Sequence, residues 1–145
     1  IMVRMPRDPK QPILTRSLIE RIILVGAVLL VGAFGLFWRF QHQGLDLART
    51  LAVNFFVFVQ IFYAFNCRSL TRSMLRVGLF SNPWFWLGVG AMVLLQIAYT
   101  HTALLNRLFQ SVPMTLEHWA LVVGLAFLVY PIVGCEKWLR ARMAR

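Results

Sequence analysis

Gln60 is the side chain in this sequence best suited to binding a small cation. It lies near the middle of a long uncharged stretch, and an amide oxygen is a reasonable ligand for a hard cation. Tyr63 follows three residues later and would share its face of a helix, whereas Asn54 and Asn66 would lie elsewhere on it. These three are candidate secondary polar contacts. The competing interpretation of Gln60 is a hydrogen bond between helices, worth ~1 kcal/mol.

The other polar residues support little chemistry. Gln96 offers the same choice as Gln60, and His101 would either titrate at a helix end or simply be solvated. Glu136 beside Lys137 is typical of a polar pair at a helix end. The sequence contains no nucleophile beside a base and neither a GxGxxG nor a Walker pattern. We therefore expect no catalytic residue, no resident metal cluster and no bound cofactor in this chain.

Four uncharged apolar stretches must position these side chains, at residues 22–38, 50–67, 77–106 and 118–135. Each reaches or exceeds roughly 17 residues, the lower limit for a helix that crosses a bilayer. The pattern predicts an all-α membrane protein with four transmembrane helices, at about 18–40, 49–66, 83–105 and 118–136. Residues 41–48, which include Asp46, are expected to form a short loop.

Basic residues alternate between crowded and sparse along the chain. The N-terminal segment holds five, the middle loop three and the C-terminal segment four, whereas the other two connections hold two and one. Lys and Arg gather on the cytoplasmic side of membrane proteins. Both termini and the middle loop are therefore predicted to be cytoplasmic.

The composition limits the class of protein. The chain is 59% hydrophobic and only 14% charged, which is too little charge to cover a soluble domain. The net charge of +10 does not indicate nucleic-acid binding, because the charges sit at the ends of apolar runs, where they would meet lipid headgroups. We expect a single membrane domain over residues 1–145. Because the chain starts at Ile1 behind a basic, proline-rich segment, we also expect it to be a fragment of a longer protein.

Local signals set the expected helix ends. Residues 1–16 contain three prolines and are predicted to be irregular. Pro83 fits the first turn of the third helix, and Pro131 should kink the fourth about a turn before Cys135. The candidate caps are Thr15 or Ser17, Ser81 or Asn82, and Thr115 with His118.

A succession of short motifs resembles one family over nearly the whole chain. The motifs are Met5-Pro6-Arg7-Asp8-Pro9-Lys10-Gln11-Pro12, Phe65-Asn66-Cys67-Arg68-Ser69, Gly78-Leu79-Phe80-Ser81-Asn82-Pro83-Trp84, Asn106-Arg107-Leu108-Phe109 and Glu136-Lys137-Trp138-Leu139-Arg140. In this order and spacing they resemble helices seven to ten of the P-type cation pumps. The likeness is greatest to bacterial members of the branch that contains the calcium and sodium–potassium pumps.

The resemblance implies a role for the parent protein. It would be an ATP-driven cation translocase of the bacterial cell membrane that uses Mg²⁺ and forms an aspartyl phosphate. The Asp-Lys-Thr-Gly-Thr motif that carries the phosphate is absent here. This segment would support the ion-carrying helices, and its partners would be the lipid bilayer, the remaining helices and cytoplasmic domains of the pump, and the transported inorganic cation.

The resemblance also bears on Gln60. Calcium pumps with two sites have Glu at the matching position, and sodium–potassium pumps have Gln there, followed three residues later by Asp. This chain departs from that pattern with Tyr63, and it has Val89 and Gly90 near the place of the ninth-helix carboxylates. Gln60 is thus the one family ligand position that carries over.

Two other function classes remain open from the residues. One is a free-standing small membrane protein, either a subunit or a proton-coupled exporter without ATPase activity. An exporter needs a membrane-embedded carboxylate, and Glu20 lies too near the end of its stretch. The other is a structural membrane anchor, which would tolerate Gln60→Ala.

Overall fold

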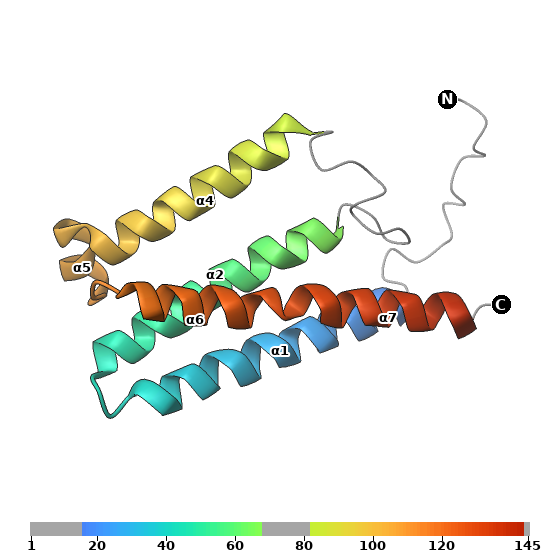
Figure 1. The fold of residues 1–145 in the computed structure, drawn as a ribbon, viewed down its shortest axis with the longest axis horizontal. Helices are drawn as coiled ribbons and strands as arrows, with labels where there is room; N and C mark the ends of the chain where they lie inside the picture. The colour runs from blue at the N-terminus through green and yellow to red at the C-terminus, as the bar shows by residue number, and fades with distance from the viewer. Residues whose placement is uncertain (1–15, 68–81, 144–145) are drawn as a thin grey trace.

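The computed structural model describes residues 16–67 and 82–143, which form six helices (Figure 1). In chain order these are α1 (Arg16–Phe40), α2 (Leu45–Cys67), α4 (Pro83–His101), α5 (Ala103–Phe109), α6 (Leu116–Phe127) and α7 (Val129–Met143). Four segments are long and apolar enough to cross a membrane: Leu18–Phe40, Leu45–Cys67, Pro83–His101 and Leu116–Leu139. The predicted all-α membrane protein with four spans is confirmed, with α6 and α7 together forming the fourth.

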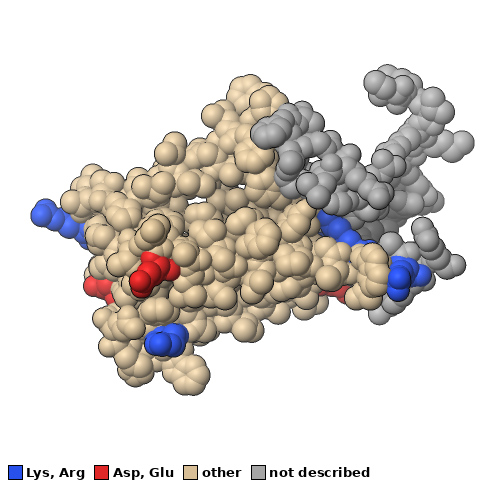
Figure 2. Space-filling model, viewed as in Figure 1, with Lys and Arg blue, Asp and Glu red and all other residues tan. Residues whose placement is uncertain are grey.

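The charged side chains gather at the two ends of the helices. On the face seen in Figure 2, an uncharged belt separates the Lys, Arg, Asp and Glu residues at one end from those at the other. A bilayer requires this distribution, because its hydrocarbon core, about 30 Å thick, disfavours charge.

We call one end the Arg21 end, after the residue that lies there near the start of α1. The other is the α5 end, where α1 turns into α2 and where α5 lies (Figure 1). The predicted cytoplasmic orientation of the termini stays a prediction.

α1 and α2 form an antiparallel hairpin that approaches closely at Gly32. A Cβ added at Gly32 would collide with the ring of Phe55, whose side chain is almost fully buried. Glycine at this position therefore lets the Phe55 ring pack directly against the backbone of α1.

The second helix starts earlier than predicted. Gly44, with φ +146°, ends the turn after α1, and α2 begins at Leu45 instead of residue 49. Asp46 therefore lies in the first turn of α2 and not in a loop. An acidic side chain is favourable there because the N-terminus of a helix carries partial positive charge. The predicted start at residue 49 was too late because it followed the beginning of the uncharged run and so left out the first turn, which holds Asp46.

α2 is the central helix. It packs against α1, α6 and α7, and more slightly against α4. The apolar core lies along these contacts and includes Leu51, Phe55, Val59, Val122, Val129 and Val133, which are almost inaccessible to solvent. α4 stands at the edge of the bundle, and Figure 1 shows it running alongside α2 and diverging from α6 and α7 toward the Arg21 end.

The fourth span breaks at Leu128, between α6 and α7, about one turn before the proline predicted to kink it. Pro131 has no backbone N–H, and its ring meets the carbonyl of the residue four positions earlier, Phe127, which is the last residue of α6. The Leu128 N–H bonds the Leu125 carbonyl at 3.2 Å, a tighter turn that closes α6. The helix is therefore interrupted near the predicted position, three residues before Pro131.

The third span is shorter than predicted. α4 ends at His101 instead of residue 105, because Thr102 adopts an extended conformation. Residues 103–109, predicted as part of the span and the outer loop, form the separate helix α5. The hydroxyl of Ser111 donates to the Tyr99 carbonyl in the last turn of α4 at 2.7 Å, so the chain folds back over the end of that helix.

Two predicted caps are confirmed. The Asn82 side chain accepts from the N–H groups of Trp84 and Phe85, with Pro83 in the first turn of α4. Thr115 accepts from the N–H of His118 at the start of α6. The candidates Thr15 and Ser81, the proline-rich segment and the middle loop from residue 68 to 81 fall outside the described residues.

Candidate functional site

Gln60 lies in the one exposed stripe of α2. Val53 and Phe56, which are 39% and 40% exposed, share this stripe, while neighbouring Asn54, Phe55, Phe58 and Val59 are buried against other helices. The positions 53, 56 and 60 are spaced three and four residues apart, so they follow one face of the helix. The bundle therefore covers α2 on its other sides and leaves this face open.

The Gln60 amide makes no hydrogen bond with the residues that the structure describes, and its side chain is exposed. It lies seven positions before the end of α2 at Cys67, a rise of about 10 Å from the Arg21 end of the helix. An amide at that depth is unfavourable against lipid tails, because hydrocarbon offers it no hydrogen-bond partner. Within this segment, Gln60 does not take the alternative role of a hydrogen bond between these helices.

Asn54 points away from Gln60, into the contact between α2 and α4. Its Nδ2 donates to the Thr50 carbonyl at 2.8 Å and to the Thr100 hydroxyl at 3.3 Å. Thr100 in turn donates to the Gln96 carbonyl at 2.8 Å. Asn54 is thus engaged in helix packing, and the structure does not bring it together with Gln60.

Gln96 is buried in the same contact. Its Nε2 and the Oδ1 of Asn54 are buried without a hydrogen-bond partner. Gln96 and Thr100 are also the only buried residues of α4. Amide and hydroxyl groups therefore join α4 to α2 at this point, while toward the Arg21 end the Phe65 ring of α2 packs against the rings of Phe85 and Trp86 of α4.

Asn66 and Tyr63 lie toward the Arg21 end. Asn66 is buried, its Nδ2 donates to the Tyr130 carbonyl at 3.4 Å, and its own carbonyl accepts from Lys137 Nζ at 2.6 Å. Tyr63 is partly buried and packs against the apolar core. Asn66 therefore joins α2 to α7, and Tyr63 alone of the three secondary candidates remains near the Gln60 face by helical spacing.

An ion pair that sequence reasoning missed closes the Arg21 end. An Arg21 Nη atom lies 3.0 Å from Glu136 Oε2, with side-chain exposures of 8% and 15%, and Arg21 Nε donates to the same oxygen at 3.1 Å. Glu136 was expected to pair with adjacent Lys137. In the structure it forms an ion pair with Arg21 of α1, and Lys137 Nζ donates to the Asn66 carbonyl of α2. The predicted topology placed Arg21 and Glu136 at the same membrane face, which was the available signal for this pair.

The α5 end holds a second polar network. The Thr50 hydroxyl donates to the Asp46 carbonyl at 2.7 Å and accepts from the Val112 N–H at 3.1 Å. Arg49 donates to Gln110 Oε1 at 2.8 Å. These bonds fix the segment between α5 and α6 against the start of α2.

His101 contacts α6. Its ring stacks on Trp119 with centroids 6.2 Å apart, and its Nε2 lies 3.4 Å from the indole nitrogen of Trp119. The side chain remains exposed, so it is both solvated and part of the α4–α6 contact. Nothing in this geometry resembles a catalytic arrangement.

Within residues 16–67 and 82–143, no group of three or more His, Cys, Asp or Glu side chains could hold a metal ion. The neutral oxygen of Gln60, on the open face of α2, is the one site candidate that is oriented away from the bundle. It cannot form a site alone, because hard cations take several oxygen ligands.

Comparison with known proteins gives a consistent result. Residues 1–139 match the family described as "Cation transporting ATPase, C-terminus". The "Probable cation-transporting ATPase F" of Mycobacterium tuberculosis is 42% identical over 141 residues, covering 96% of this chain and 16% of that protein. The rat "Calcium-transporting ATPase type 2C member 2" is 33% identical over 142 residues, covering 93% of this chain and 15% of that protein.

A third relative has a slightly lower sequence identity to this chain. The "Cation-transporting ATPase pma1" of Synechocystis is 32% identical over 129 residues, covering 83% of this chain and 14% of that protein. The chain spans about a sixth of the length of such relatives.

These matches favour a pump domain over a free-standing subunit or a small exporter. The chain is a member of the family formed by the C-terminal membrane domains of cation-transporting ATPases.

Proposed function

We propose that this chain is the C-terminal support domain of an ATP-driven cation pump in the bacterial cell membrane. The proposal rests on the family match and on relatives whose names describe cation and calcium transport. ATP, Mg²⁺ and the phosphorylated aspartate belong to parts of the parent protein outside these 145 residues. The single membrane domain is one part of that longer chain.

The exposed amide of Gln60 is the observation that carries the role of this segment. α2 spans the membrane, yet the stripe of Val53, Phe56 and Gln60 is uncovered by the bundle. Since a glutamine facing lipid is unfavourable, the stripe requires a polar neighbour. We assign that place to the ion-carrying helices of the parent pump, with Gln60 directed toward the transported cation.

The rest of the bundle would hold α2 in position. The Arg21–Glu136 pair and the bond from Lys137 to the Asn66 carbonyl join α1, α2 and α7 at one end. The Thr50–Val112 bond joins α2 to the α5–α6 segment at the other. With both ends of α2 fixed, the ion-carrying helices can move against an open face that stays in place.

The test is Gln60→Ala in the full-length pump. The cation concentration that half-activates ATP hydrolysis should rise about fivefold, which corresponds to the ~1 kcal/mol of one hydrogen bond or weak ligand. The thermal unfolding midpoint should change little, because Gln60 makes no hydrogen bond with residues 16–67 or 82–143 of this domain.

Gln96→Ala is the matched control. It removes the other glutamine of the membrane spans, which is buried between α4 and α2. It should leave cation activation unchanged. Unaltered cation activation in Gln60→Ala would refute the ion-facing role and leave a purely structural anchor.

A further inference from the structure

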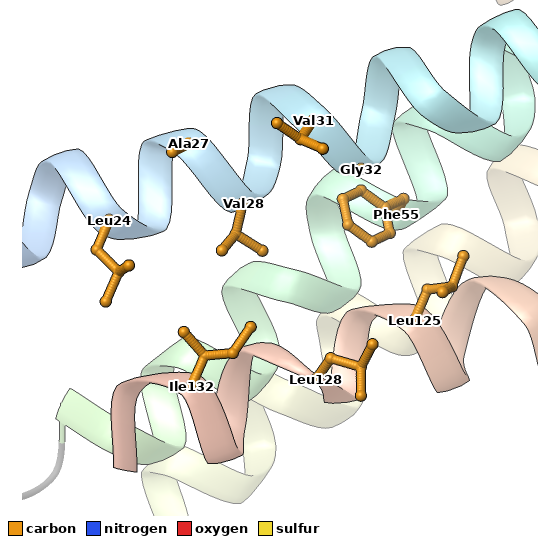
Figure 3. Close-up of a pocket in the computed structure, with 9 residues that line it drawn as sticks. All are labelled: Leu24, Ala27, Val28, Val31, Gly32, Phe55, Leu125, Leu128 and Ile132. Carbon is orange, nitrogen blue, oxygen red and sulfur yellow. The ribbon is translucent and has the colours of Figure 1, made fainter. Parts of the chain in front are cut away.

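An apolar groove runs along the outside of the bundle between α1 and the fourth span. Leu24 and Val28 of α1 point toward Leu128 and Ile132, with Phe55 of α2 beside Gly32 (Figure 3). This part of the groove has a volume of about 390 Å³ and is lined entirely by apolar side chains and glycine.

The groove continues toward the α5 end. A second hollow of about 470 Å³ shares Val31, Gly32 and Leu125 with the first, and its lining extends to Gly35 and Arg39. The two hollows therefore form one path. From Leu24 to Arg39 this path rises about 22 Å along α1.

The two ends of the groove differ. Arg21 and Glu136, one helical turn beyond Leu24 and Ile132, pair at 3.0 Å and bring α1 and α7 together there. At the other end Arg39 lines the groove, next to Trp38, which is 75% exposed. An exposed Trp beside an Arg at the end of a span marks the headgroup level of the membrane.

We propose that this groove binds one acyl chain of a glycerophospholipid, with the phosphate of the headgroup beside Arg39. The apolar lining matches the chain, and the guanidinium matches the phosphate, which it can contact with two parallel N–H donors. Glu117, one turn before the lining residue Leu121, also lies at this end. We therefore assign the headgroup preference to the contact of the phosphate with the Arg39 guanidinium.

A transmembrane helix fits the groove less well. A helix that crosses the membrane must run through about 30 Å of hydrocarbon, whereas the groove closes at the Arg21–Glu136 pair after about 22 Å. An acyl chain starts at the headgroups and ends inside the membrane. It can therefore end where the groove ends.

Two glycines of α1 provide a matched test. A Cβ added at Gly35 or at Gly26 meets nothing within 4 Å, so both positions accept a side chain without a clash. Gly35 lines the groove and Gly26 does not. Gly35→Leu should fill the groove, while Gly26→Leu should add the same side chain to the same helix outside it.

The experiment uses the full-length protein, delipidated in mild detergent and offered phosphatidylglycerol or diacylglycerol with the same acyl chains. Native mass spectrometry counts the tightly bound lipids. The wild type and Gly26→Leu should bind one more phosphatidylglycerol than Gly35→Leu. Arg39→Gln should reduce the preference for phosphatidylglycerol over diacylglycerol at this site by about fivefold.

Equal lipid counts in Gly35→Leu and Gly26→Leu would overturn the proposal. So would an unchanged lipid preference in Arg39→Gln, or a polypeptide bound in place of the lipid. The Arg39 variant keeps the test decisive if Gly35→Leu fails to fold, because the Arg39 side chain is exposed. The readout does not depend on cation activation, so this inference and the proposed pump function can fail separately.

Discussion

α2 and α4 are both long apolar spans, yet α2 is largely buried by other helices and α4 is largely exposed. In the most apolar window of α2, 44% of residues are buried, against 11% in α4. The buried side chains of α2 are mainly apolar, whereas the two buried side chains of α4 are Gln96 and Thr100. Apolar composition therefore favours insertion of a helix into the membrane, but it does not decide whether the helix packs at the centre or at the edge of the bundle.

The reason lies in what each helix presents to its neighbours. α2 offers large side chains such as Phe55 and Phe58 on several faces, and these interlock with α1 and α6. α4 contacts α2 through a few hydrogen bonds near the α5 end and through ring contacts of Phe65 with Phe85 and Trp86 at the Arg21 end. It leaves Leu87, Leu94 and Leu95 exposed. Because lipid is as apolar as leucine, such exposure carries little cost and provides little force for packing.

The largest contrast should come from Phe55→Ala. The Phe55 ring is 2% exposed and packs against Gly32, so its removal leaves a cavity worth roughly 3–5 kcal/mol. The thermal unfolding midpoint of the full-length protein in detergent should fall strongly. Leu94→Ala on α4, a residue that is 68% exposed, should leave it nearly unchanged. An equal loss for Leu94→Ala would break the comparison and show that other parts of the parent protein cover α4.

Glycine replacements should give a smaller contrast in the same direction. Gly32→Leu would force the new side chain against the Phe55 ring and should cost about 1–3 kcal/mol by overpacking. Gly88→Leu on α4 meets nothing within 4 Å of its Cβ and should be tolerated. Both variants are compared by the same thermal midpoint. Tolerance of Gly32→Leu would mean that α1 and α2 separate more easily than their packing indicates.

The smallest effect should come from Gln96→Leu. Its Nε2 is buried without a partner, so replacing the amide by an apolar group removes an unsatisfied donor and should change stability by less than about 1 kcal/mol. Asn54→Leu, by contrast, also removes the hydrogen bond to Thr100 and should loosen α4. Hydrogen exchange of the α4 backbone would detect this loosening. A large loss in Gln96→Leu would show that its amide finds a partner in the full-length protein.

Much of the helical framework could be predicted from the residues. The four uncharged runs gave the spans, because hydrocarbon tolerates no charge at its centre. Asn82 and Thr115 were recognised as caps because each offers a side-chain oxygen to the free N–H groups at a helix start. The helix ends were less accurate at Leu45 and His101, where backbone turns at Gly44 and Thr102 override the hydropathy pattern.

At the candidate site, too, the sequence predicted one part and the tertiary structure decided the rest. Sequence alone gave Gln60 as a polar side chain near the middle of a span, with an amide oxygen that could bind a hard cation. Only the tertiary structure showed that Gln60 faces outward, whereas Asn54 and Asn66 form hydrogen bonds with α4 and α7. It also paired Arg21 with Glu136, residues at opposite ends of the chain.

The sequence thus determined which segments enter the membrane, because that depends on each segment's own transfer free energy. Helix pairing depends on side-chain shape and polar partners from distant segments, so only the folded structure decided it.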